Sequence, residues 1–426
     1  MHRRHFIETA TAATALASLT QASEGTFSRA PEPVIVGVMG MSRGRDLAME
    51  LVKLEGVEVR YVCDADMQRA ESAAKVVNDT GANSIPIQDF RRILDDKEVH
   101  ALFCAAPNHW HGPATIIGCK AGKHVYVEKP ACHNAQEGAW MIEAAKRYGR
   151  CVQMGTQRRS SAGYLKAIEQ LHLGVIGKVY LSRAFYNSKR GSIGTRADAP
   201  APANLNFDLW QGPAPRKAYR ENFVHYNWHW FWHWGNGELG NNGVHLVDLC
   251  RWGLGVEFPI RTVSSGGRYR YQDDQETPDT QSVAWEFEGG KQITYEGLSC
   301  AKHPGGPFVS FYGYDGYMEI DGDGGYRIFD PNDKLQETVP ATGGGQKEHI
   351  ANFIEAIRAD APGLLRQPIL SAHQSTLLCH LGNIAQRAGQ TIATDPKSGR
   401  LLDESLASKY WGREYDAAWD TQVRIP

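Results

Sequence analysis

The residues best suited to proton transfer lie at the end of a strand-like run. Glu128-Lys129-Pro130 directly follows the run His124-Val-Tyr-Val. A lysine held in a dry cleft beside a substrate hydroxyl can accept a proton as hydride leaves the carbon, or polarise the carbonyl in the reverse reaction. Lys129 is therefore a candidate catalytic and substrate-contacting residue. The alternative is a surface Glu/Lys pair before a turn, where proline fixes the backbone or takes a cis bond.

A second polar group lies at the start of a segment with helical periodicity, Gly243-Val-His245-Leu-Val-Asp248. Histidine titrates near neutral pH, so His245 could exchange a proton; the alternative is a helix-start histidine that hydrogen-bonds the backbone. Asn241 can orient a hydroxyl but cannot take its proton. Asp248 lies near the same helical face as His245, where it either orients the imidazole or pairs locally.

The segment from His225 to Glu238 contains four alternating tryptophans, and we expect that not all of them belong to a core. Tryptophan faces stack on sugar rings, and indole N–H groups bind hydroxyls. The segment therefore predicts a carbohydrate-binding platform that leads into Asn241 and His245. Its candidate substrate contacts are Trp228, His229, Trp230, Trp232, His233 and Glu238.

The histidines of this segment also allow a metal-binding interpretation. His225, His229 and His233 are spaced so that a helix would align them on one face. In a strand or an irregular loop, the tryptophans would lie on one side and His229 and His233 on the other. Helix-breaking residues follow at once, and the prediction includes no metal.

Three basic residues, Lys189, Arg190 and Arg196, lie in a Gly/Pro/Ala-rich excursion before the aromatic segment. Such loops often carry specificity, and these charges could meet an acidic sugar. We expect solvated loop charges instead.

A glycine-containing turn between a predicted strand and a predicted helix is the candidate cofactor site. Backbone amides at a helix N-terminus can bind a pyrophosphate. The G-x-G-x-x-G pattern is imperfect, because Ser42 replaces its second glycine. The predicted cofactor contacts in this turn are Gly37, Gly40, Met41, Ser42 and Arg43.

Asp64 ends the next predicted strand and offers a carboxylate to an adenosine ribose diol. Its alternative role is a helix N-cap. A carboxylate there repels a 2′-phosphate, so NAD is predicted rather than NADP, although Arg43 and Arg69 could neutralise a phosphate.

The polar turn Ala106-Pro107-Asn108-His109-Trp110-His111 follows the third or fourth strand. Loops after parallel strands carry ligand contacts, so Pro107, Asn108 and His111 are expected to line a nicotinamide pocket. The alternative is a capped turn with solvent-facing histidines.

Short β-branched runs alternate with helical periodicity in the first part of the chain. Predicted strands at 34–39, 57–63, 101–106, 124–128 and 151–155 indicate a doubly wound, parallel Rossmann sheet of the α/β class. From about residue 178, successive strands with short turns predict an α+β domain with a large, mostly antiparallel sheet. We therefore predict an NAD(P)-binding domain at 31–155 and a substrate-binding and oligomerisation domain at 156–426.

The N-terminus resembles a twin-arginine signal peptide. Arg3-Arg4-His-Phe-Ile precedes an alanine-rich stretch and Thr20-Gln-Ala22, a small-residue cleavage site. The alternative is an arginine-containing N-terminus of a cytoplasmic enzyme. We expect residues 1–30 to be a signal and linker, and the protein to be periplasmic or otherwise exported.

Composition excludes several other classes. The formal net charge is −2 and basic residues form no runs, which argues against nucleic-acid binding. The eight cysteines contain no CxxC pair, which argues against a zinc ribbon, an iron–sulfur site or a disulfide scaffold. The apolar run from Ile7 to Leu19 is too short and interrupted to span a membrane.

Together, the glycine turn, Asp64, Pro107-Asn108, Glu128-Lys129-Pro130 and Gly243-Val-His245-Leu-Val-Asp248 resemble the Gfo/Idh/MocA family from residue 33 onward. Further matches are Tyr314-Asp-Gly-Tyr and His349-Ile-Ala-Asn. The resemblance implies a Rossmann domain that binds NAD or NADP, a substrate contact at Lys129 and a proton-handling role for His245.

The resemblance carries three further expectations. Glu128 and Lys129 count among the predicted cofactor contacts. Asn241 stands where the family has an aspartate, which departs from the family's proton relay although Asn241 remains a predicted catalytic-site residue. A homodimer or homotetramer formed through the open sheet is expected.

Three functions follow. The leading one is hydride transfer between NAD and a sugar, glycoside or polyol, with Lys129 and His245 moving the proton. If the protein is exported, the cofactor must be restored within each cycle, as in transhydrogenation or glycoside cleavage through a transient 3-keto sugar. The third is a carbohydrate-binding protein without turnover, suggested by Asn241 and the altered glycine turn.

Overall fold

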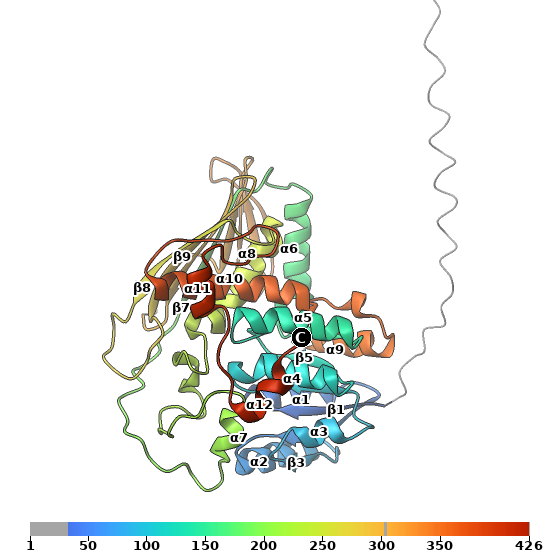
Figure 1. Cartoon of the computed structure of the whole chain (residues 1–426). Coiled ribbons are helices and arrows are strands. Elements are labelled where there is room, and N and C mark those ends of the chain that lie inside the picture. Colours follow the sequence, from blue (N-terminus) through green and yellow to red (C-terminus); the bar gives the residue numbers. More distant parts are fainter. Residues whose placement is uncertain (1–32, 302–304, 426) are drawn as a thin grey trace, which may run out of the picture.

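The computed structural model describes residues 33–301 and 305–425 (Figure 1). The predicted signal peptide lies outside these residues. The first domain contains a parallel sheet with strand order β3-β2-β1-β4-β5-β6. Its strands are β1 (Val34–Met39), β2 (Val57–Cys63), β3 (Ile85–Ile87), β4 (Ala101–Cys104), β5 (His124–Val127) and β6 (Val152–Met154).

Burial explains why most of these strands could be predicted. Every residue of β1, β4, β5 and β6 is buried, so each strand is a continuous apolar run covered on both faces. The sequence did not predict β3, which has three residues including Pro86 and forms an edge of the sheet.

Helices cover both faces of this sheet. One face packs against α1 (Arg43–Leu51), α2 (Met67–Asn78) and α9 (Gln346–Arg358), and the other against α3 (Arg91–Asp95), α4 (Asn108–Lys120) and α5 (Ala135–Arg147). Two of the covering elements come from late in the chain. Phe353 of α9 contacts the rings of Phe103 and Tyr126, and Trp419 of α12 (Ala417–Val423) contacts the ring of Trp110.

The second sheet has nine strands in the order β14-β13-β12-β11-β7-β10-β9-β8-β15. Only β7 and β10 are parallel neighbours; the other pairs are antiparallel. Its strands are β7 (Leu181–Asn187), β8 (Arg261–Gly267), β9 (Thr280–Phe287), β10 (Lys291–Leu298), β11 (Val309–Tyr312), β12 (Tyr317–Ile320), β13 (Tyr326–Phe329), β14 (Leu335–Val339) and β15 (Ile392–Ala393).

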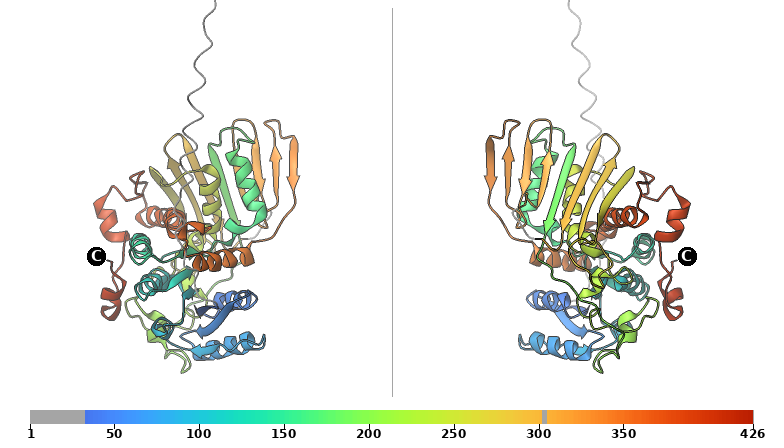
Figure 2. Two further views of the ribbon diagram at one scale, coloured as in Figure 1. Left: turned by 90° about the vertical axis from the view of Figure 1, so that its right-hand side faces the viewer. Right: turned by 90° about the vertical axis from the view of Figure 1, so that its left-hand side faces the viewer.

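Helices α6 (Ala162–His172) and α8 (Val244–Leu254) pack on one face of this sheet (Figure 2). Helix α10 (Ile369–Ala388) contacts α5 of the first domain as well as α8 and β8 of the second. After α11 (Glu404–Tyr410), the chain returns to α4 through α12 (Figure 1). The remaining elements are α7 (Phe207–Gln211), short 3₁₀ turns at Gln157–Ser160, Asn227–Trp230 and Pro362–Leu364, and a π-helical turn at Leu239–Gly243.

The predicted fold class is confirmed: a Rossmann sheet is followed by a large, mostly antiparallel sheet. One predicted turn is wrong. Helix α4 begins at Asn108, so His109 and His111 are buried helical residues rather than solvent-facing turn residues.

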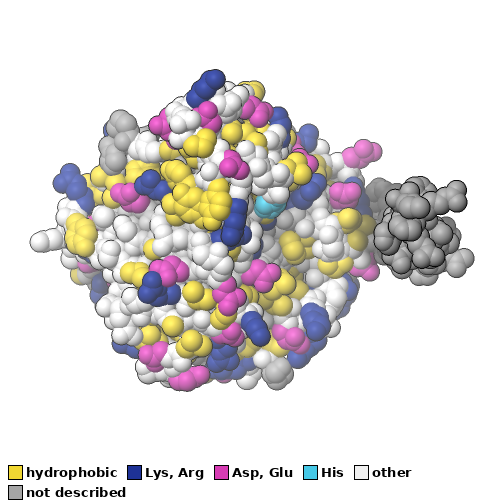
Figure 3. Space-filling view, turned by 90° about the horizontal axis from the view of Figure 1, so that it is seen from above, with side chains coloured by type: hydrophobic (Ala, Val, Ile, Leu, Met, Phe, Trp, Pro, Cys, Tyr) yellow, Lys and Arg dark blue, Asp and Glu magenta, His cyan; other side chains and the backbone are white. Residues whose placement is uncertain are grey.

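Surface and helix properties bear on two other predictions. Within the described part of the chain, no helix combines the length and apolar character needed to cross a membrane. On the face shown in Figure 3, basic and acidic side chains are interspersed rather than gathered by sign.

Candidate functional site

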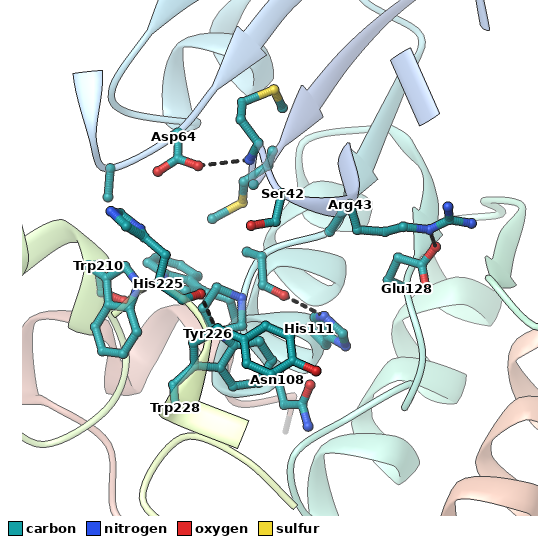
Figure 4. Close-up of a pocket in the computed structure, with 18 of the residues that line it drawn as sticks. Ser42, Arg43, Asp64, Asn108, His111, Glu128, Trp210, His225, Tyr226 and Trp228 are labelled. Carbon is teal, nitrogen blue, oxygen red and sulfur yellow. Dashed lines mark hydrogen bonds and ion pairs between the residues drawn. The ribbon is translucent and has the colours of Figure 1, made fainter. Parts of the chain in front are cut away.

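A cavity of about 540 Å³ opens where the strand order of the parallel sheet reverses, beside the ends of β1 and β4 (Figure 4). In doubly wound sheets, ligands bind at this switch point. The structure brings together here the predicted residues Gly40, Met41, Ser42, Arg43, Asp64, Pro107, Asn108, His111, Glu128, Lys129, Trp228, His229, Asn241 and His245.

The turn after β1 requires glycine at position 40. Gly40 has a φ of +92°, and a Cβ there would overlap the backbone of Ala105 after β4. Helix α1 begins directly after Ser42, whose side chain does not cap it. Amides in the first turn of α1 are therefore oriented for an anion, and a cofactor pyrophosphate fits this position.

Asp64 faces the same turn. Its Oδ2 accepts a hydrogen bond from the Met41 amide at 2.7 Å, and its Oδ1 accepts one from the Asp66 amide at 3.0 Å (Figure 4). The N-cap of α2 is Asp66, which accepts from the amides of Gln68 and Arg69. The N-cap alternative for Asp64 is therefore wrong, and its carboxylate borders the cavity where a ribose diol would bind.

The two arginines that could neutralise a 2′-phosphate lie in different places. Arg69 Nη2 donates to Ser42 Oγ at 2.6 Å, and its Nε lies 3.5 Å from Asp64 Oδ2. Arg43 instead donates from Nε to Glu128 Oε1 at 3.1 Å and also bonds Gln346 of α9. Figure 4 shows Arg43 pointing toward Glu128, on the far side of the turn from Asp64. Arg43 therefore positions Glu128 rather than a phosphate near Asp64.

Lys129 follows β5 and lies half-buried in the cavity wall, before a cis peptide bond to Pro130. Its Nζ donates to the backbone oxygen and to Oδ1 of Asn241, both at 3.0 Å. Burial lowers the pKa of Lys129 below its ordinary value, while the charges of Glu128 and Glu238 oppose that shift. The surface-pair alternative for Glu128-Lys129 is therefore wrong.

His111 links the ends of two strands beside Lys129. Its Nδ1 lies 2.6 Å from the carbonyl oxygen of Pro130, and its Nε2 lies 2.7 Å from that of Ala106. Burial lowers the pKa of His111. The imidazole thus fixes the turn that carries Lys129 against the turn after β4.

His245 lies buried in the first turn of α8, directly after the π-helical turn that carries Asn241. Burial holds its pKa well below the ordinary value, so the expected titration near neutral pH is wrong and the imidazole is neutral. Its Nδ1 has no hydrogen-bond partner within residues 33–301 and 305–425. Since Nδ1 is enclosed, a substrate hydroxyl can hydrogen-bond only the part of the neutral imidazole that lines the cavity.

Asp248 does not orient His245. Its two carboxylate oxygens accept from Nε and Nη2 of Arg159, each at 2.8 Å, and Oδ1 also accepts from Ser375 and Gln367. The side chain is buried, and although burial alone would raise the pKa of Asp248, Arg159 holds it below its ordinary value. Asp248 therefore anchors α8 to its neighbours.

The aromatic segment differs from the predicted single platform. Trp228, Trp230 and Trp234 are buried and Trp232 is half-buried, so not all four belong to a core, but three of them lie in the interior. Trp228 and His229 line the cavity and stack on each other, with ring centroids 3.6 Å apart.

The helix face needed for the metal alternative does not form, because the segment contains only a 3₁₀ turn. His225 Nε2 lies 3.0 Å from Asp66 Oδ2, His229 Nδ1 lies 2.5 Å from the Tyr226 carbonyl oxygen, and His233 Nε2 lies 2.7 Å from that of Pro215. Among the described side chains, no three His, Cys, Asp or Glu residues are arranged to hold a metal ion.

Arg190 is a cavity residue that the sequence did not assign to the site. It pairs with buried Glu238, donates to Tyr226 Oη at 2.8 Å, and lies 4.7 Å above the ring of Trp230. The expected solvated loop charge is therefore wrong for Arg190, whereas Lys189 and Arg196 are exposed. No local sequence signal identifies Arg190, because its carboxylate partner lies far along the chain.

The remaining predicted residues lie outside the cavity lining. Gly37 lies within β1, where a Cβ would collide with Ile93 of α3, so it serves packing. Trp230 and Glu238 contact Arg190 but do not themselves line the cavity. Trp232 and His233 line a different cavity. Further lining residues that the sequence did not single out include Tyr226, Asn242, Trp210 and Gln157.

Family models match nearly the whole described chain. Residues 32–156 match the oxidoreductase family, NAD-binding Rossmann fold, of the Gfo/Idh/MocA group, and residues 165–421 match the C-terminal alpha/beta domain of the same group.

Among curated proteins, the chain is 28% identical over 169 residues to a glycosyl hydrolase family 109 protein of Saccharopolyspora erythraea, covering 38% of this chain and 37% of that protein. It is 25% identical over 206 residues to levoglucosan dehydrogenase of Pseudarthrobacter phenanthrenivorans, covering 48% and 45%. The chain thus spans less than half the length of these relatives.

A solved structure of levoglucosan dehydrogenase in complex with NADH and levoglucosan shares the fold. Its TM-score is 0.67 at 17% identity, over 85% of this chain and 99% of that one. The match of both family models, across both domains, decides the assignment. The chain therefore belongs to the Gfo/Idh/MocA family of oxidoreductases, and its first domain is an NAD-binding Rossmann fold.

Proposed function

We propose that this protein transfers hydride between NAD and a hydroxyl-bearing carbon of a sugar, glycoside or polyol. The observation that carries the proposal is the pair of hydrogen bonds from Lys129 Nζ to Asn241, in the wall of the same cavity as Gly40 and Asp64. NAD, when bound, supplies the hydride acceptor or donor. Gly40 and the first turn of α1 would hold its pyrophosphate, and Asp64 its adenosine ribose.

Lys129 handles the substrate proton in this proposal. Burial lowers its pKa, which brings the amine closer to exchanging a proton with a substrate hydroxyl near neutral pH. Asn241 holds Nζ in place, because its backbone and side-chain oxygens accept two of the ammonium protons. A third proton of the ammonium remains for the substrate oxygen.

His245 supplies a second polar contact from the opposite domain. His245 lines the cavity, and its neutral imidazole can hydrogen-bond a neighbouring substrate hydroxyl. Trp228 and His229 offer ring surface in the same cavity, although each covers one face of the other. The names levoglucosan dehydrogenase and glycosyl hydrolase among the relatives support a carbohydrate substrate.

The direct test is a panel of sugars, glycosides and polyols with NAD, followed by absorbance near 340 nm. Lys129→Ala should lower kcat/KM by about 10²- to 10⁴-fold, the usual contribution of a positioned acid–base group. Lys166→Ala is the matched control, because Lys166 is an exposed lysine of α6 outside the cavity. Unchanged activity in Lys129→Ala would refute the assignment, and no turnover of any sugar would favour a non-catalytic binding protein.

A second candidate is a redox-neutral reaction in which NAD is restored within each turnover. The relative named as a glycosyl hydrolase supports it, as does an amide rather than a carboxylate beside Lys129. Denaturing the purified protein should release about one NAD per chain, and chromatography should show glycoside cleavage without net NADH. Release of no NAD would refute this candidate.

We also propose that residues 31–155 and 156–426 form the two domains. We propose that residues 1–30 direct export. The protein is, in this proposal, a homodimer or homotetramer. The Arg3-Arg4 pair supports export, and the face of the second sheet opposite α6 and α8, which no described helix covers, supports self-association (Figure 2). Replacing Arg3 and Arg4 with lysine should keep the protein in the cytoplasmic fraction. Light scattering of the purified protein measures the number of subunits.

A further inference from the structure

A second cavity, of about 510 Å³, lies on the other side of the aromatic segment from the candidate active site. Trp232 and His233 face it, whereas Trp228 and His229 face the first cavity. Helix α10 and the segment that follows α11 form its other walls. The site described above uses none of these residues.

In the part of the chain that the structure describes, two arginines of this cavity form no salt bridge, although the charge of Glu137 acts on Arg413 and that of Glu276 acts on Arg387. Arg387 of α10 lies between two rings, 4.8 Å from the Trp232 centroid and 4.9 Å from that of Tyr410. Arg413 donates from Nη1 to the His233 carbonyl oxygen at 3.0 Å and contacts His133 Nδ1 at 3.3 Å. Within the described residues, no carboxylate lies within ion-pair distance of either guanidinium. Burial lowers the pKa of both arginines, although their charge is retained.

The remaining charges of the cavity add to this excess. Lys217 and Lys409 bring two more cations, against the carboxylates Glu276 and Glu414. Glu276 accepts a hydrogen bond from the Trp232 amide at 2.8 Å but keeps its charge, so four cations of the lining face two carboxylates. A cavity with guanidinium groups that lack a carboxylate, and with aromatic walls, suits a small molecule that carries an oxyanion.

We propose that this second cavity binds the carboxylate or phosphate of a small molecule, such as a sugar acid or a sugar phosphate, with Arg387 and Arg413 as the principal contacts. The geometry favours this ligand over a neutral one, because an anion can pair with the guanidinium of half-buried Arg413 and with that of Arg387, which is exposed at the cavity and lies between two rings. The proposal does not depend on the reaction in the first cavity.

Calorimetric titration of the full, NAD-loaded protein tests it, with glucose 6-phosphate, glucuronate and glucose as probes. At least one of the two anions should bind, more weakly as salt rises. Arg387→Gln should weaken that binding at least tenfold. Arg261→Gln, at an exposed position of β8, should leave it unchanged. Preference for glucose 6-phosphate or for glucuronate identifies the anion as phosphate or carboxylate.

Two further variants separate the cavities. Arg190→Gln removes a cation from the first cavity and should change the affinity for the anion by less than twofold. Lys409 is exposed, so Lys409→Gln serves as a second probe of the same site should Arg387→Gln fail to fold. The proposal is overturned if neither anion binds, if Arg190→Gln rather than Arg387→Gln abolishes binding, or if a folded Arg387→Gln or Lys409→Gln protein binds as tightly as the parent.

Discussion

Lys129 of the first domain and Asn241 of the second are joined by two hydrogen bonds of 3.0 Å, from one ammonium nitrogen to a backbone and a side-chain oxygen. Both acceptors are neutral, so they orient the ammonium without the charge stabilisation that a carboxylate would give. Burial and the charges of Glu128, Glu238, Arg43 and Arg158 act on the pKa of Lys129, and a charge introduced at residue 241 would add to them.

Asn241→Asp should shift the pH dependence of oxidation. A carboxylate within hydrogen-bond distance favours the charged ammonium and raises the pKa of Lys129, commonly by 1–3 units, or roughly one here. If neutral Lys129 is the base, kcat/KM should rise only at correspondingly higher pH. Asn241→Ala is the comparison, because it removes the side-chain bond without adding charge. Superimposable pH profiles for Asn241→Asp and the parent would show that residue 241 does not set this pKa.

Asp64→Ser should weaken the binding of NAD and reduce the preference of the protein for NAD over NADP. The change removes the acceptor of the Met41 amide and the candidate ribose contact, and it frees Arg69, 3.5 Å away, to meet a 2′-phosphate. The KM for NAD should rise about tenfold, as expected for loss of roughly one charge-assisted hydrogen bond. Asp95→Ser, at an exposed position of α3, should leave both cofactors unaffected. Equal cofactor preference in Asp64→Ser and the parent would contradict the assignment.

Gly40→Ala should cost more than the backbone strain of alanine at positive φ. Gly81 has the same φ of +92°, and none of the described atoms lies within 4 Å of the place its Cβ would take, so Gly81→Ala measures that strain alone, about 1–2 kcal/mol. Gly40→Ala adds overlap with Ala105 and should also lose bound NAD. Denaturant unfolding and the NAD content of both variants provide the measurement. Equal losses of stability, with NAD retained, would mean that the close approach of the two turns is unimportant.

Glu137 should make stability fall as pH rises. Burial raises its pKa to about 7 from an ordinary 4.5, and its carboxyl accepts from Tyr415 Oη and the His133 amide. The folded state binds the proton of the Glu137 carboxyl more tightly than the unfolded state does. This binding therefore stabilises the folded state fully below about pH 4.5, and the contribution is lost by about pH 7. The free energy of unfolding falls by about 3 kcal/mol over this range, at roughly 1.4 kcal/mol per unit of pKa shift.

Glu137→Gln should flatten this dependence, since glutamine mimics the protonated acid. Glu143→Gln, on the same helix but half-exposed, should keep the slope of the parent. The measurement is the free energy of unfolding between pH 4.5 and 7.5. A Glu137→Gln protein with the same slope as the parent would assign the pH dependence to other groups.

Much of the fold could be predicted because a strand that is buried on both faces appears in the sequence as a continuous apolar run. β1 and β2 coincide with the predicted strands, whereas the three residues of β3 are too few to form such a run. The Gly40 turn, Asp64 and Lys129 could be found because each follows a predictable strand. The start of α4 could not, since buried His109 and His111 look polar while their rings bond to carbonyl oxygens.

Side chains outside regular elements were harder to place. Alternation of tryptophan suggested one shared surface, but the 3₁₀ turn at Asn227–Trp230 and the chain after it direct Trp228 and Trp232 to different cavities. Arg190 resembled a solvated charge because its pairing with Glu238 joins two segments that are 48 residues apart along the chain. Such pairings depend on the tertiary fold of the second domain, which local patterns do not encode.

Coverage of the first sheet by α9 and α12 has a consequence for the order of events during synthesis. Phe103 and Tyr126 receive their contacts from Phe353, and Trp110 from Trp419. At 5–20 residues per second, the ribosome needs roughly 10 to 40 s to pass from the end of β6 to the start of α9. Throughout that interval the nascent nucleotide-binding half carries uncovered aromatic side chains on both sides of its sheet, so it is a natural client for chaperones that shield emerging chains.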